Sequence, residues 1–468
     1  MIIGLYIILI IALFVTAFTK RDTKLVIPIL IFSYLFGGHL NTSLYSIAGR
    51  LPHELILILA FVLLHLLGVL TKKTHFFKIT WGDKVFAFFY IVIYIIPWVI
   101  NIYDYINDSA VMLVRQFLPV KIWIVYRIFY YIIFDELRRN KNTVNKAFNL
   151  MLQSYIFGML VSGIIGTIRM MKIPVLKEAI DISWPIIYVQ AESNWLRMLG
   201  TVGGTNGGGI LFAISAVATL FLFFRLKKRI YLYLFPVFIL FLLLTASFSS
   251  TFIFILMLAL LFYKSKNVNF KQIIQLSFYS FALASLLLLN GTFRETISKT
   301  LENRVERQMG DMEAEGVEEE TNYTPSSLAI RIDLWYTYID FFLEKPIFGY
   351  GYRKSEKPTH GRDARASISE SYFVETLLYG GIFAFFGFMF FIYLIYQKNN
   401  YIRLFKEEAL LISIIFTGIL VSQISNMSIM YGGIMEIIGI ILCFIEGFLY
   451  TEKYIVPRLT AKSKSINN

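Results

Sequence analysis

The chain has 468 residues, of which 57% are hydrophobic and only 16% are charged. This composition is typical of a protein with many membrane-spanning helices and excludes a water-soluble globular enzyme. The formal net charge is +13. In a multi-spanning protein such an excess of Lys and Arg lies in cytoplasmic loops, so we expect these charges to meet anionic lipid and not nucleic acid.

Apolar stretches long enough to cross a bilayer recur along the whole chain. They are continuous rather than alternating, so they predict helices and not barrel strands. The sequence therefore predicts an all-α, polytopic membrane helical bundle of about 12–13 transmembrane helices. The expected spans lie near residues 2–18, 25–45, 54–70, 85–100, 112–134, 147–168, 207–224, 230–246, 251–263, 273–289, 372–396, 409–425 and 429–450.

The loops between these spans alternate in charge. Short basic loops such as KRDTK and ELRRNKN are typical of the cytoplasmic side, so the two long loops face outward. The expected organisation is N-terminal transmembrane helices (1–168), a first outer loop (169–206), central transmembrane helices (207–289), a large outer loop with an interfacial helix (290–371), C-terminal transmembrane helices (372–450) and a cytoplasmic tail (451–468).

Three cations occur in the fifth predicted span, Arg115, Lys121 and Arg127. Each charge at mid-bilayer costs about 2.5–3.5 kcal/mol on insertion scales, so each needs a partner. Glu436 in the last span is a plausible counter-ion for Lys121 or Arg127. Two readings stay open, an ion pair that locks two helices and a charge that draws in an anionic group. Pro119 can divide an interfacial segment from the span proper.

The first outer loop ends in NWLRMLGTVGGTNGGG, just before a predicted span. Arg197 follows an interfacial tryptophan. Asn206 lies among glycines that leave backbone N–H groups free at a helix start, where an anion can bind. The same glycines can equally serve close helix packing in a membrane.

The large outer loop contains one clearly predicted helix. Ser326 or Ser327 can cap its start, and Pro346 stops it. Between these residues the sequence has apolar side chains at three- and four-residue spacing, namely Leu328, Ile332, Trp335, Ile339 and Phe342.

Arg331, Thr337 and Asp340 fall away from this apolar stripe. We therefore expect the helix to lie along the membrane interface, with Trp335 and Tyr338 at headgroup depth. Arg331 would then lie where a lipid-linked phosphate emerges from the membrane.

The turn GYGYR, residues 349–353, follows this helix. Glycine permits a positive φ and a close backbone approach at little cost. Gly351 and Arg353 are therefore candidates for contact with a substrate.

Taken in order, these motifs resemble the O-antigen polymerase and O-antigen ligase superfamily, the Wzy-like bacterial polysaccharide polymerases. The likeness covers roughly residues 197–391 and includes RMLGTVGGTN, LLLTASFSS, R-x-x-x-W, P-x-x-G-x-G and S-E-S-Y-x-x-x-x-L-x-x-G-G. It implies a glycosyltransferase with a helical GT-C-like membrane fold that uses undecaprenyl-diphosphate-linked sugar. In that family outer-loop arginines hold the lipid diphosphate, a role that falls here on Arg197 and Arg331.

The chain departs from the family pattern in two places. Ligases of the superfamily typically begin the last motif with His-Asn, whereas this chain has Ser369-Glu370, which favours a polymerase. The common T-x-S-R turn has Phe248 in place of the arginine, and Arg353 or Lys121 can supply the missing charge.

Transfer from a sugar-diphosphate lipid needs positive charge on the departing diphosphate and a base for the attacking hydroxyl. Glu370 is the expected base, because partial desolvation where the loop meets the membrane would raise its pKa. It can equally serve to pair with Arg331 or Arg353. His360 and Asp363 are weaker candidates for the base. The outer loops lack metal-ligand spacing, so we expect transfer without a metal ion or other cofactor.

The sequence thus predicts a polymerase that joins undecaprenyl-diphosphate-linked oligosaccharide repeats into an O-antigen, capsule or exopolysaccharide. It would work at the outer face of a bacterial cytoplasmic (inner) membrane, with membrane lipid, and with a flippase and a chain-length regulator as further possible partners. An O-antigen ligase-type transferase and a lipid-linked oligosaccharide flippase or transporter remain alternatives, although a flippase usually keeps its loops short. The candidate catalytic residues are Glu370, Arg331 and Arg197, and the candidate substrate-binding residues are Arg353, Lys121, Arg115, Asn206, Gly351 and Tyr372.

Overall fold

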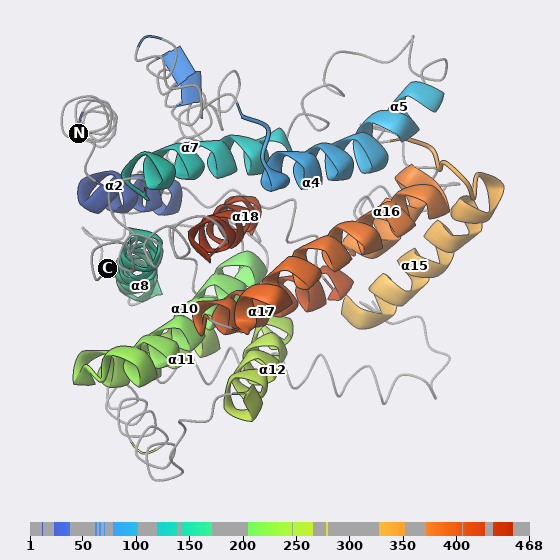
Figure 1. Ribbon diagram of the computed structural model, residues 1–468. Helices are drawn as coiled ribbons and strands as arrows, with labels where there is room; N and C mark the ends of the chain where they lie inside the picture. Colours follow the sequence, from blue (N-terminus) through green and yellow to red (C-terminus); the bar gives the residue numbers. More distant parts are fainter. Residues whose placement is uncertain are drawn as a thin grey trace, which may run out of the picture.

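A computed structural model describes the chain over residues 23–37, 78–101, 119–137, 143–170, 205–245, 247–264, 327–351, 371–404, 406–425 and 434–452, with a few single positions elsewhere. These ranges hold helices and no strand (Figure 1). The helices are α2 (Thr23–Gly37), α4 (Trp81–Tyr90), η2 (Ile91–Ile95), α5 (Ile96–Ile100), α7 (Val120–Leu137), α8 (Thr143–Met170), α10 (Thr205–Leu226), α11 (Arg229–Leu244), α12 (Phe248–Lys264), α15 (Ser327–Glu344), α16 (Tyr372–Arg403), α17 (Glu408–Ser425) and α18 (Ile434–Tyr450).

Several of these helices are long and apolar enough to cross a membrane. Among the described residues the four long ones are Trp81–Ile100, Thr143–Arg169, Gly207–Leu226 and Tyr372–Arg403, and three shorter apolar helices accompany them. The prediction of a polytopic helical membrane protein is therefore confirmed. The predicted spans 2–18 and 273–289 lie almost wholly outside the described residues, as does most of 54–70.

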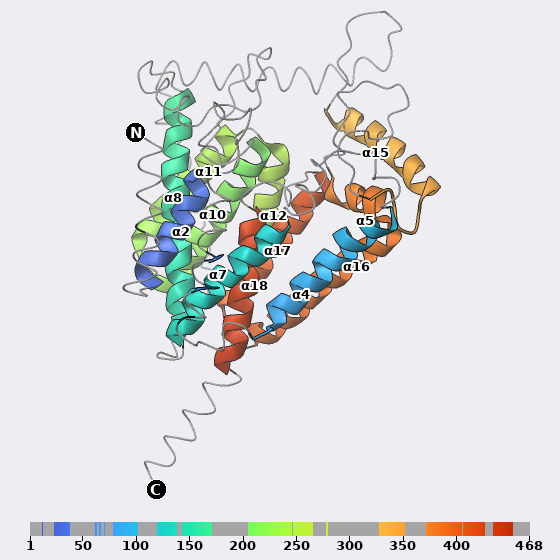
Figure 2. The same ribbon diagram turned by 90° about the horizontal axis from the view of Figure 1, so that it is seen from above.

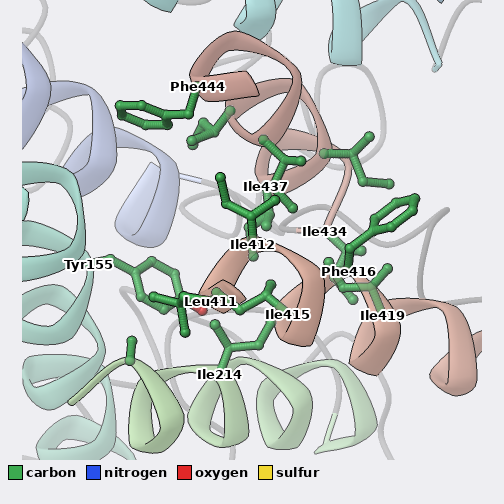
Figure 3. Close-up of a cluster of buried hydrophobic side chains, with 14 of the residues drawn as sticks. Tyr155, Ile214, Leu411, Ile412, Ile415, Phe416, Ile419, Ile434, Ile437 and Phe444 are labelled. Atoms are coloured by element: carbon green, nitrogen blue, oxygen red, sulfur yellow. The ribbon is translucent and has the colours of Figure 1, made fainter. Parts of the chain in front are cut away.

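α10 is the central helix of the bundle. Of its most apolar segment 89% is buried, against 39% for Trp81–Ile100, and it packs on α8, α11, α12 and α17. Isoleucines and aromatic residues of α8, α10, α17 and α18 pack together in one buried cluster (Figure 3). Because lipid is as apolar as these side chains, close packing and not exclusion of water holds such helices together.

A second set of helices carries α15. The continuous segment α4–η2–α5 packs along α16, and α15 packs on the start of α16. Figure 2 shows α15 at one end of the bundle and the end of α18 at the other. α15 and the end of α18 thus lie at opposite ends of the bundle.

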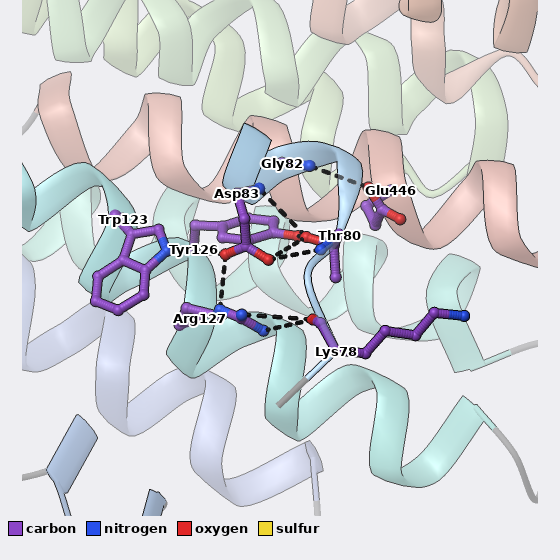
Figure 4. Close-up of polar contacts among 8 residues, drawn as sticks. All are labelled: Lys78, Thr80, Gly82, Asp83, Trp123, Tyr126, Arg127 and Glu446. Atoms are coloured by element: carbon purple, nitrogen blue, oxygen red, sulfur yellow. Dashed lines mark hydrogen bonds and ion pairs between the residues drawn. The ribbon is translucent and has the colours of Figure 1, made fainter. Parts of the chain in front are cut away.

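The start of α4 is fixed by a buried carboxylate, Asp83 (Figure 4). Its Oδ1 accepts from the Trp123 indole (2.8 Å) and pairs with Arg127 Nε (2.8 Å) on α7. Its Oδ2 accepts from the backbone and hydroxyl of Thr80, both at 2.7 Å. Thr80 and Asp83 form a capping box at the start of α4. The same residues also bind α7, since the Thr80 hydroxyl is hydrogen-bonded to the Tyr126 hydroxyl.

The sequence offered two cations as partners of Glu436, namely Lys121 and Arg127, and the structure pairs it with one of them. Lys121 forms the ion pair with Glu436 between α7 and α18, which confirms the first pairing. Arg127 instead pairs with Asp83. Pro119 immediately precedes α7, which confirms that the span proper begins after it.

A turn and a kinked helix are joined by backbone hydrogen bonds. At Gly381 the backbone of α16 leaves the helical conformation, with φ +66° and ψ −170°. The turn at 346–351 supplies the bonds that the kink breaks. They run from Ile382 N to Pro346 O (2.8 Å), Phe383 N to Ile347 O (3.2 Å), Tyr350 N to Leu378 O (3.0 Å) and Gly351 N to Tyr379 O (2.7 Å).

Glycine is required on both sides of this turn-kink joint. Gly349 has φ +62°, and a Cβ there would lie 2.5 Å from the backbone carbon of Tyr379. A Cβ on Gly381 would lie 2.3 Å from the carbonyl oxygen of Ile347. The P-x-x-G-x-G and G-G motifs therefore act together, as the two halves of one joint that fixes α15 on α16.

We expect Asp83→Ala to destabilise the protein by about 3–5 kcal/mol, because it leaves the Arg127 cation without the carboxylate that faces it. The measurement is unfolding in detergent. Lys84→Ala, at an exposed neighbouring position, is the matched control and should change stability by less than about 0.5 kcal/mol. Equal midpoints for the two variants would contradict the anchoring role.

Gly349→Ala should cost at least about 2 kcal/mol, since alanine disfavours a positive φ and its methyl group meets backbone. Gly207→Ala is the control. A Cβ at Gly207 has nothing within 4 Å, so alanine should be neutral or stabilise the helix by up to about 1 kcal/mol. Folded yield and thermal midpoint in detergent separate the two, and a stable Gly349→Ala protein would rule out the joint as a constraint.

Candidate functional site

The predicted site residues are described to different extents. Arg115, Arg197, Arg353 and Glu370 lie outside the described residues, as do His360 and Asp363. Arg331 and Asn206 are described by their backbone alone, on α15 and α10. Lys121, Gly351 and Tyr372 are described in full.

α15 packs on the bundle through one face, which includes Tyr338 and Phe341. Its bounds, Ser327–Glu344, confirm the predicted helix. Tyr338 and Phe341 are buried against the bundle, whereas Ile339 of the predicted stripe is 45% exposed. The Tyr338 side chain is 3% exposed and packs into protein, while its predicted headgroup depth stays a prediction.

The backbone of Arg331 lies on the face of α15 that packs against the bundle. Residues 331 and 338 are seven apart, about two helical turns, so their backbone positions share one face of α15. That is the face on which Tyr338 and Phe341 are buried. Tyr336 and Leu343, 68% and 65% exposed, lie elsewhere on the helix and suit a membrane interface.

A buried carboxylate missed by the sequence reasoning lies under this face. Glu375 is in the first turn of α16 and is 6% exposed. Burial raises the pKa of Tyr338, and the charge of Glu375 raises it further, so the two groups are near neighbours. An acidic residue so close to the start of an apolar run was the available signal, because such a charge is expensive.

Tyr372, a candidate substrate-binding residue, is completely buried at the start of α16. Its hydroxyl lies 2.9 Å from that of Tyr94 on η2. The preceding Ser371 donates from its hydroxyl to the carbonyl of Gln423 on α17 (3.3 Å). The residues next to Glu370 are therefore held from two neighbouring helices.

Gly351 uses its backbone N–H within the protein. It donates to Tyr379 at 2.7 Å, and Tyr350 and Gly349 donate to Leu378 and Lys345 at 3.0 Å each. The N–H groups of this turn thus serve the turn-kink joint.

The start of α10 meets a cluster of hydroxyls at the turn between α11 and α12. A Cβ on Gly209 would lie 2.6 Å from Ser250 Oγ and 3.1 Å from Thr245 Oγ1. Ser247 and Ser250 hydroxyls are 2.8 Å apart, and both residues are buried. The structure thus brings together TNGGG and TASFSS, two of the predicted motifs, at one end of the bundle.

Lys121 lies in the first turn of α7, and its ion pair with Glu436 is almost buried, with 11% and 3% of the two side chains exposed. The first turns of α7 and α18 therefore carry a balanced charge pair. This pair is a lock between two helices in the structure as it stands.

The arrangement can support transfer chemistry at a membrane surface. α15, which carries Arg331, is rigidly mounted on the start of α16, which directly follows Glu370. An anionic leaving group requires a cation, and an attacking hydroxyl requires a group such as a carboxylate to accept its proton.

Comparison with known proteins shows a family similarity over part of the chain. No curated protein sequence matches the chain. Residues 195–389 match the family model described as O-antigen ligase, a stretch that begins at Trp195 and ends within α16. The match supports the resemblance drawn from the motifs: over these residues the chain is similar to the O-antigen polymerase and ligase superfamily.

Proposed function

We propose that the protein is a polymerase that joins lipid-diphosphate-linked oligosaccharide repeats into a surface polysaccharide. The observation that carries the proposal is the family match over residues 195–389, which coincides with the elements joined at the kink of α16. The family supports a glycosyltransferase-like enzyme acting on lipid-linked glycans. Polymerase rather than ligase rests on Ser369-Glu370, where ligases typically have His-Asn.

In the proposed reaction a hydroxyl of the incoming repeat attacks the anomeric carbon of the growing chain. The new glycosidic bond forms as the bond from that carbon to the diphosphate oxygen breaks. The hydroxyl proton passes to Glu370, and the lipid diphosphate leaves with the electron pair. Arg197 and Arg331 stabilise the charge on the leaving group through paired hydrogen bonds.

The remaining candidates have supporting roles in this proposal. Arg115, Lys121 and Arg353 add positive charge around the diphosphate, and Asn206 lies at the glycine-rich start of α10. Gly351 and Tyr372 shape the site through backbone and packing. Undecaprenyl diphosphate as the carrier, the outer face of the inner membrane, transfer without a metal ion, and a flippase and chain-length regulator as partners are part of the same proposal.

A ligase that moves the finished glycan to another acceptor is the second candidate. The description of the matched family, O-antigen ligase, favours it. The two activities differ in their product, because a polymerase gives a ladder and a ligase gives a single transfer.

The arginines can be tested with purified protein in liposomes and lipid-linked oligosaccharide extracted from cells that lack this gene. Arg197→Ala and Arg331→Ala should each lower turnover by about a hundredfold or more, because each removes a charged donor from the leaving group. Arg229→Ala, an exposed arginine at the start of α11, is the matched control and should retain activity. Glu370→Gln should lose the ladder as well.

A ladder that persists in both arginine variants would refute the proposed site. A single-step product from wild type would make the protein a ligase. Lipid movement across the liposome without bond formation would make it a flippase.

Lys121 can be tested separately from its ion pair. Lys121→Met should lower stability, since it strips the cation from the buried Glu436. In Lys121→Met/Glu436→Gln the stability should recover, but the KM for the lipid-linked donor should stay raised by about tenfold, a factor worth about 1.4 kcal/mol. Recovery of wild-type KM in the double variant would restrict Lys121 to locking the helices.

A further inference from the structure

A buried hydroxyl contact joins the first third of the chain to the start of α16. Tyr94 and Tyr372 are 1% and 0% exposed, and their hydroxyls are 2.9 Å apart. Phe89 packs edge-on against Tyr94 (5.8 Å), and Phe388 packs edge-on against Tyr372 (5.0 Å). The hydroxyl pair is enclosed by apolar rings, where a hydrogen bond is stronger than in water.

Tyr94 lies in a π-helical turn. In η2 the N–H of Ile96 donates to Ile91, five residues back, and the widened turn separates α4 from α5. π-helical turns are rare and occur frequently at functional sites. This turn packs against α16, and Ile93 and Pro97 lie close to Gly380, beside the kink.

Tyr372 is only two residues from Glu370. Consecutive Cα atoms are 3.8 Å apart, so the Cα of Glu370 lies within about 7.6 Å of that of Tyr372. Whatever fixes Tyr372 therefore also limits where Glu370 can be. The turn-kink joint holds the other end of the same helical segment, at residues 378–383.

We infer that Tyr94 is a positioning residue of the transferase site, which acts through Tyr372 to hold the residues at the start of α16. The inference rests on the proposed function, because it assigns Glu370 to the chemistry. Tyr94 is far outside residues 195–389, so the N-terminal helices contribute to the site and not only to membrane anchorage.

The hydroxyl contact can be removed while the ring is kept. Tyr94→Phe and Tyr372→Phe should each lower kcat by about tenfold with the KM for the lipid-linked donor changed less than twofold, because a misplaced group affects the transition state more than binding. The double variant should be no worse than either single variant, since both remove the same contact.

The matched control is Tyr396→Phe on the same helix. Its hydroxyl pairs with Thr417 at 2.6 Å, near the other end of α16, so its removal also costs one buried hydroxyl contact. It should leave kcat within twofold of wild type. Losses in Tyr94→Phe and Tyr396→Phe of equal size, or losses that multiply in the double variant, would overturn the inference.

A second readout does not need the reaction. Hydrogen exchange of the segment 371–380 should become at least tenfold faster in Tyr94→Phe and stay unchanged in Tyr396→Phe. Unchanged exchange in Tyr94→Phe would also overturn the inference. If wild type forms no glycosidic bond, the proposed function fails, while the exchange result still decides whether Tyr94 positions the start of α16.

Discussion

A helix inside a membrane cannot leave backbone groups without hydrogen bonds, because no water is present to accept or donate them. The kink of α16 at Gly381 would leave two N–H groups and two carbonyls in that condition. The turn at 346–351 supplies all four partners. This exchange allows α16 to bend, and it also joins α15 through its following turn to a helix long enough to cross a membrane.

The position of the candidate site follows from that joint. α15 carries Arg331, and the segment before the kink begins two residues after Glu370. Tyr372, the first residue of α16, is about two and a half helical turns before Gly381, and Arg331 is about four turns before the turn at 346–351. The backbone positions of Arg331 and Tyr372 are therefore set by helices joined at the kink.

Two further sets of contacts hold the frame at its two ends. At one end Asp83 fixes the start of α4 to α7 through Trp123, Arg127 and Thr80. Near the other end the Tyr94 and Tyr372 hydroxyls join the same helix to the start of α16. Buried polar contacts of this kind resist sliding, because a shifted register would strand charged or polar atoms in an apolar setting. Lys121 and Glu436 do the same between α7 and α18.

Much of the fold of this protein could be inferred from its sequence, because the bilayer imposes simple rules on the composition and length of its helices. The helical membrane fold, the bounds of α15, the start of α7 after Pro119 and the choice of Glu436 as counter-ion for Lys121 or Arg127 follow from apolar length, proline positions and the cost of buried charge. The family resemblance was likewise carried by residues that must be glycine or proline for backbone reasons, such as Gly349 and Gly381.

Contacts between distant segments could not be inferred in this way. The face that α15 buries depends on the shape of α16 beneath it, so Ile339 is exposed and Tyr338 is buried against expectation. Glu375, the Tyr94 hydroxyl and the partner of Arg127 became visible only when helices far apart in sequence were placed side by side. Periodicity and composition determine which segments are helical and where each helix ends. The residues that each helix face contacts are decided by packing among all the helices at once.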